Sequence, residues 1–84
     1  MTNSNLTSAE TESLRTFFAA QVAKCERGLA RGNARIRELD AKGLRYGDAG
    51  WTDRCIAGAA AVEMAVGCRG ELAYWHRRQT EHGF

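Results

Sequence analysis

The stretch Cys55-Ile-Ala-Gly-Ala-Ala-Ala-Val-Glu-Met-Ala-Val-Gly-Cys68 decides the fold of this chain. It contains a single polar side chain, that of Glu63, and most of its other residues are very small. A helix that is apolar on nearly every face must be covered on more than one side. We therefore expect an earlier helix of the same chain to cover one side and a second copy of the protein to cover another.

Glu63 itself allows two interpretations. It either pairs with an arginine of the earlier helix or marks a narrow solvent-facing stripe of its own helix. Buried carboxylates are uncommon unless they are paired, which favours the solvent-facing stripe.

A long amphipathic helix is predicted before this stretch. Thr7-Ser-Ala-Glu10 has the pattern of a capping box, and Gly43 suits the left-handed conformation that ends many helices. Between these two points, apolar or small residues recur at alternating steps of four and three, which is typical of a coiled-coil seam. These residues are Phe18, Val22, Cys25, Leu29, Gly32, Ile36 and Leu39. The first helix is therefore expected over about residues 8–42.

The loop and the second helix follow directly. Gly47 and Gly50 are turn formers, Asp48 or Thr52 is expected to cap the second helix, and Trp51 is expected to close that end with Tyr46. The second helix is predicted over about residues 51–81. Two helices of matched length and a short loop predict an all-α antiparallel hairpin in a single domain, residues 1–84, with residues 1–6 frayed.

A lone hairpin of this size is expected to be only marginally stable, because so short a chain buries only about 60% of its unfolded surface. We therefore predict a homodimer that forms a four-helix bundle. Gly28 and Gly32 lie one turn apart, and each costs about 1 kcal/mol relative to alanine in a helix. A kink would explain them, but close approach of another alanine-rich helix explains them better. The expected interface with the second copy consists of Gly28, Gly32, Ala57, Ala61, Val62, Ala65 and Val66.

The cysteines and histidines do not have the spacing of a metal site. Cys68 and His76 are separated by eight positions of one helix, which is about 12 Å along its axis. Zinc ligands must all lie within about 2.3 Å of the ion. We therefore interpret the thiols as small core residues and expect no metal, no cofactor and no enzymatic activity.

Basic residues suggest a binding surface instead. Four of them form one stripe of the first helix, and a second group interleaves aromatic rings with cations near the end of the chain. Phosphate or nucleic-acid binding would use such groups. A solvated basic face, with the aromatic rings packed on Phe17 and Phe18, explains them more simply. The candidate binding residues are Lys24, Arg27, Arg31, Arg35, Tyr74, Trp75, Arg77 and Arg78.

Composition and charge point to a cytoplasmic protein. The net charge of +2 is mild, and the three cysteines do not form an even disulfide framework. Met1–Asn5 lacks the basic and apolar regions of a signal peptide. The apolar run is shorter than the roughly 20 residues needed to span a bilayer, so we expect no membrane association.

One resemblance bears on function. Trp51 at the start of the second helix, the triplet Met64-Ala65-Val66 and Arg69 resemble a pattern in small phage helical-hairpin proteins that sequester cyclic nucleotides and so blunt CBASS or Thoeris defence. The chain departs from that pattern at Ala59–Val62, where a glutamine-rich turn is expected, and no ligand-binding residue carries over. The resemblance implies a phage or mobile-element inhibitor of host defence, acting in the host cytoplasm. It would bind a protein effector, such as a CRISPR complex, or sequester a nucleotide signal; a structural adaptor or a nucleic-acid-binding dimer is the alternative.

Overall fold

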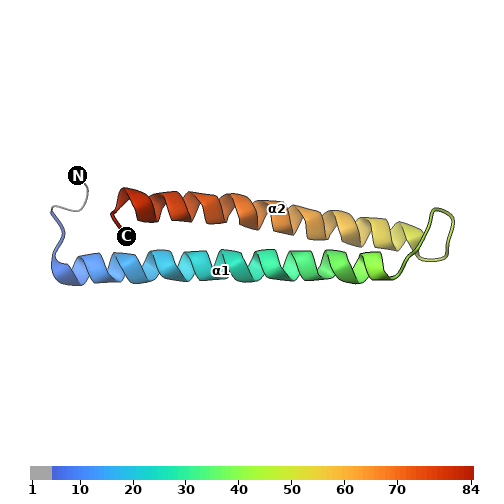
Figure 1. Ribbon diagram of the computed structural model, residues 1–84, viewed down its shortest axis with the longest axis horizontal. Helices are drawn as coiled ribbons and strands as arrows, with labels where there is room; N and C mark the ends of the chain where they lie inside the picture. The colour runs from blue at the N-terminus through green and yellow to red at the C-terminus, as the bar shows by residue number, and fades with distance from the viewer. Residues whose placement is uncertain (1–4) are drawn as a thin grey trace.

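The computed structural model describes residues 5–84 and contains two long helices, α1 (Ser8–Ala41) and α2 (Trp51–Glu81). The helices lie side by side and run in opposite directions, and one loop joins them at one end (Figure 1). The result is a rod with extents of 62 × 17 × 14 Å, and no strand occurs in residues 5–84. The predicted antiparallel all-α hairpin is therefore confirmed.

The predicted helix bounds agree with the structure to within one residue. α1 ends at Ala41, with Lys42 as its C-cap, instead of at residue 42. The part of the fraying prediction that concerns residues 1–4 lies outside the described residues.

The start and the end of α1 follow the predicted chemistry. The Glu10 N–H donates to Thr7 Oγ1 over 3.0 Å, and the Thr7 N–H donates to Glu10 Oε1 over 2.9 Å. These two bonds make the capping box and satisfy donors that a helix start leaves unpaired. Gly43 has φ of 63°, the left-handed conformation predicted for it beyond the helix end.

The start of α2 differs from the prediction. Its N-cap is Gly50, which has φ of 86° and makes no side-chain capping bond. The carboxylate of Asp48 instead accepts a hydrogen bond from the Arg45 N–H over 2.7 Å. The backbone carbonyl of Asp48 accepts one from the Trp51 N–H over 3.1 Å. Asp48 therefore stabilises the turn before the helix instead of capping the helix itself. Trp51 does contact Tyr46, edge to face at 4.9 Å between ring centroids.

The contact between the two helices forms along one line that we call the inner seam. On α1 its buried residues are spaced by seven, and on α2 they are glycine and alanine. A Cβ at Gly32 would come within 3.1 Å of the Ala61 carbonyl oxygen and 3.2 Å of the Ala65 nitrogen, so backbone approaches backbone here. The inner seam consists of Phe18, Cys25, Gly32, Leu39, Gly58, Ala61 and Ala65.

This packing corrects the predicted interface with a second copy. Gly32, Ala61 and Ala65 are buried between the two helices of one chain. Gly28 also faces α2, because a Cβ there would lie 2.5 Å from Cys68 Sγ. The small residues therefore let α1 approach α2, and this approach buries Gly32, Ala61 and Ala65. Of the seven residues predicted, Val62 and Val66 are exposed, while Ala57 is half-buried.

The exposed surface of α2 is largely apolar. Glu63 is exposed and has no ion pair in residues 5–84, in agreement with the solvent-facing interpretation. Large apolar side chains are nevertheless exposed along the same helix, in contrast to the polar outer face of α1. They are Ile56, Val62, Met64, Val66 and Tyr74.

Candidate functional site

Two grooves run along the hairpin, one on each side of the inner seam. The first is made of two depressions, of about 350 Å³ and 370 Å³, which share Arg31 and Met64 and are therefore adjacent. Its wall on α1 is formed by the four cations predicted from the sequence, so the structure brings all of that stripe to one place. We call it the basic groove. Its lining includes Lys24, Arg27, Arg31 and Arg35 from α1, and Ala57, Ala60, Met64, Cys68 and Glu71 from α2.

The floor of the basic groove is apolar. Gly28 and Gly32 have no side chains, and Ala57 and Ala60 have the shortest ones, which is why a depression exists there at all. Ala60 is exposed, so its small size is not required by the contact between the helices.

The cations of the groove are mostly uncompensated within the chain. Arg35 pairs with Glu38 at 3.1 Å, but Lys24, Arg27 and Arg31 have no ion pair in residues 5–84. Like charges spaced by three or four residues of a helix repel each other modestly. An anionic partner placed in the groove would relieve that repulsion.

The groove on the opposite side is predominantly apolar. A depression of about 420 Å³ lies there, and Ile36, Ala59 and Val62 are among its lining residues. Arg54 and Glu63 are the charged residues of that lining. Helical spacing places Leu29 and Val22, seven and fourteen residues before Ile36, on the same stripe of α1. Val66 follows Val62 by one turn. We call this surface the apolar side; it consists of Val22, Leu29, Ile36, Ala59, Val62 and Val66.

Sequence reasoning missed the α1 half of the apolar side. Val22, Leu29 and Ile36 were assigned to one seam together with the residues now seen to be buried. The structure separates them, because Phe18, Cys25, Gly32 and Leu39 are buried whereas the other three are only half-buried. The signal was present in the sequence as two parallel seven-residue repeats offset by four positions.

An aromatic cluster closes the open end of the hairpin and contains most of the second predicted binding group. The Trp75 ring packs against Phe17 and Phe18, at 5.6 and 5.8 Å between ring centroids, and Phe18 also contacts Phe84 at 5.9 Å. Tyr74 packs on Trp75 at 4.9 Å. Trp75 therefore packs on Phe17 and Phe18 as the packing alternative predicted, whereas Tyr74 contacts its chain neighbour Trp75 and is exposed.

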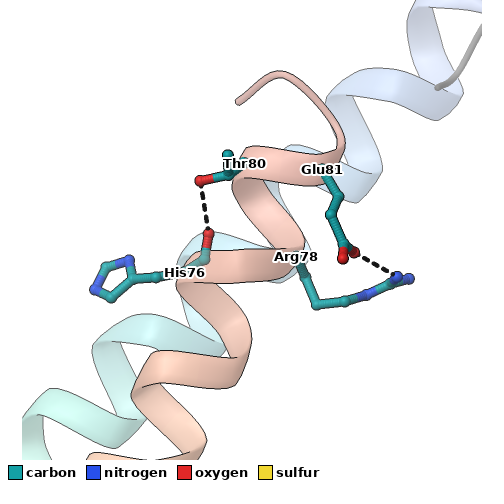
Figure 2. Close-up of polar contacts among 4 residues, drawn as sticks. All are labelled: His76, Arg78, Thr80 and Glu81. Atoms are coloured by element: carbon teal, nitrogen blue, oxygen red, sulfur yellow. Dashed lines mark hydrogen bonds and ion pairs between the residues drawn. The ribbon is translucent and has the colours of Figure 1, made fainter. Parts of the chain in front are cut away.

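The cations of this group have partners within the chain. The Arg77 guanidinium lies 5.7 Å from the centre of the Tyr74 ring. Arg78 forms an ion pair with Glu81 at 3.1 Å, and the Thr80 hydroxyl donates to the His76 carbonyl over 3.1 Å (Figure 2). The Arg78–Glu81 pair lies on the side of α2 away from the His76 ring (Figure 2). These contacts are all made within α2, between residues three or four positions apart.

The thiols lie in different surroundings. Cys25 is buried in the inner seam, and burial raises the pKa of its thiol, with a further rise from the nearby Glu71 carboxylate. That carboxylate accepts a weak hydrogen bond from Cys25 Sγ at 3.7 Å. Cys55 and Cys68 are half-buried. Residues 5–84 contain no group of three or more His, Cys, Asp or Glu side chains placed to hold a metal ion.

No helix in the described part of the chain has the length and apolar character needed to cross a membrane. No protein-family model, curated protein or solved structure matches the chain.

Proposed function

We propose that the protein is a non-catalytic binding protein that works as a homodimer, in which the apolar sides of two hairpins pack together as a four-helix bundle. The observation that carries this proposal is the exposure of large apolar side chains on α2, with Val62 and Val66 47% and 55% exposed. Apolar stripes of this kind on both helices are the surface that a bundle core requires.

The small core of the single hairpin supports the same conclusion. Within residues 5–84, five apolar side chains are buried, and two of those belong to alanine. The chain exposes 5977 Å² at a mass of 9.2 kDa, whereas a compact monomer of that mass exposes about 4,900 Å². The excess, about 1,000 Å², is close to the roughly 800 Å² that each partner buries in a standard interface.

Pairing through the apolar side would leave the basic groove on the outside of each hairpin. A two-fold symmetric dimer would therefore carry two equivalent basic grooves on its opposite outer faces. The apolar side would hold the assembly together, and the rest of the surface would be free for a partner.

Light scattering at micromolar concentration tests self-association. We expect twice the mass of the chain for the natural protein and one chain mass for Val66→Glu, because the carboxylate would be buried without a partner. Met64→Glu is the matched control: Met64 is 43% exposed on the same helix but lines the basic groove, so this variant should stay dimeric. A fully helical natural monomer would contradict the proposal.

For the biological role we propose inhibition of a host defence system through binding of a protein effector. The resemblance carried by Trp51, the Met64–Val66 triplet and Arg69 supports a defence-related role. The apolar floor of the basic groove, which the dimer would leave open, supports protein contact. Expression in bacteria that carry a CRISPR, CBASS or Thoeris system should raise the plating efficiency of a phage which that system restricts. Unchanged plating with every such system would leave the structural adaptor as the better proposal.

The nucleotide route makes a separate prediction. If the protein sequesters a nucleotide signal, a cyclic di- or trinucleotide at a hundred times its dissociation constant should stabilise the fold by about 2.7 kcal/mol. A thermal melt would show this as a rise of several degrees. The rise should disappear in Arg27→Ala/Arg31→Ala.

A further inference from the structure

The basic groove has a second property beyond its charge, namely an apolar floor in the half near Arg31 and Arg35; its other half also includes Cys25, Cys68 and Glu71. Near Arg31 and Arg35 the floor consists of Gly32, Ala57 and Ala60, none of which has a side-chain hydrogen-bonding group. A ligand there would be held by apolar contact in the centre and by charge at the edge. An amphipathic helix presents that combination of an apolar stripe with polar flanks.

The spacing of the cations also fits a helix. Lys24 and Arg35 are separated by eleven positions of α1, so the stripe extends for about 16 Å, or three helical turns. Carboxylates on successive turns of a second helix recur at about the same interval. Arg27 and Arg31, which have no ion pair in the described part of the chain, would face the middle of such a stripe.

Nucleic acid fits the groove less well. Single strands are held mainly by bases stacked on aromatic rings, together with a cationic track for the backbone. No aromatic side chain lines either depression of the groove. The rings of α2 instead pack in the end cluster.

We propose that the basic groove binds an acidic amphipathic helix of a partner protein. The apolar residues of that helix would lie on the alanine and glycine floor, and its carboxylates would pair with Lys24, Arg27, Arg31 and Arg35. This site is separate from the apolar side, so the inference does not depend on self-association.

Fluorescence anisotropy with two synthetic peptides tests the proposal. The first is a helix-forming peptide of about 18 residues with a leucine and alanine stripe flanked by glutamates. The second has lysine at every glutamate position. We expect the acidic peptide to bind the natural protein at low salt and to weaken as the salt rises from about 50 to 300 mM. The basic peptide should not bind, and failure of the acidic peptide to bind would overturn the proposal.

Two variants separate the charge of the groove from its shape. Arg27→Glu/Arg31→Glu should weaken acidic-peptide binding by at least about tenfold. The double variant Arg37→Glu/Arg45→Glu changes the net charge equally at exposed positions that line neither depression, and it should bind almost as the natural protein does. Equal losses in both would show non-specific attraction and would overturn the assignment to the groove.

Ala60→Trp fills the groove without changing its charge. Because Ala60 is exposed, the fold should persist, which a circular dichroism melt checks. Peptide binding should nevertheless fall several-fold; unchanged binding would show that the apolar floor is not used. A 20-nucleotide oligothymidine serves as the competing probe. Binding of that probe in place of the acidic peptide would favour nucleic acid and overturn the proposal.

Discussion

The apolar side and the basic groove run along the same two helices and border the same inner seam, yet they have opposite chemistry. On α1 the apolar side presents Val22, Leu29 and Ile36, whereas the basic groove presents lysine and arginine at equivalent heights. The apolar side stabilises the protein only if another molecule covers it and removes its side chains from water. In the basic groove the cations remain hydrated, and the repulsion between them slightly destabilises the fold. We propose that the apolar side serves assembly and that the basic groove serves recognition.

The largest loss of folding stability is expected from substitutions in the inner seam, which lies between the two surfaces. Ala65→Arg would place an unpaired charge at a position only 3% exposed, which should cost about 3–5 kcal/mol and unfold the chain. Circular dichroism measures the loss of helix. The neighbouring Val66→Arg, at an exposed position of the apolar side, should remain helical but monomeric. If the two variants lost helix equally, the distinction between the inner seam and the apolar side would be wrong.

A smaller loss of folding stability is expected from a substitution on the apolar side. Ile36→Ala removes a half-buried side chain next to the depression of that side, and should cost about 1–2 kcal/mol. Because the residue would also contact the second copy, the loss should depend on protein concentration in a thermal melt. A loss that is the same at low and high concentration would place Ile36 outside the dimer interface.

The buried thiol of Cys25 makes the stability of the inner seam depend on pH. Because the folded-state pKa of Cys25 is raised, its contribution to stability is complete below the ordinary value of 9.0 and is lost as the pH rises through the higher folded value. The free energy of unfolding should therefore fall above pH 9.0 in the natural protein and fall less in Cys25→Ala. Denaturant titrations across that range measure this difference. A thiol reagent should also modify Cys25 more slowly than the half-buried Cys55 in the native state.

The smallest effect is expected in the basic groove. Arg31→Gln removes one member of a row of like charges, so it should stabilise the protein by roughly 0.2–0.5 kcal/mol at low salt. The gain should shrink as the ionic strength rises. Paired thermal melts at low and high salt measure it. A clear destabilisation would mean that the guanidinium has a partner within the assembly, and the groove would then be structural.

Much of this architecture follows from the sequence alone. The capping box at Thr7, the left-handed Gly43 and the steps of four and three determine α1 through local hydrogen bonding and helical periodicity. The lengths of the two helices and the short loop determine the antiparallel hairpin. The stripe of Lys24, Arg27, Arg31 and Arg35 could likewise be placed on one surface, because residues three or four apart share a helix face.

Only the tertiary structure decided which side of each helix meets the other. Gly32 and Ala61 could equally have faced a second copy, because their small size indicates close approach without indicating the approaching helix. Likewise, Val22 and Cys25 belong to one periodic pattern, and their separation into a half-buried and a buried stripe depends on the rotation of α1 against α2. That rotation is set by contacts between residues far apart in the chain, such as Gly32 with Ala65, and local periodicity does not contain it.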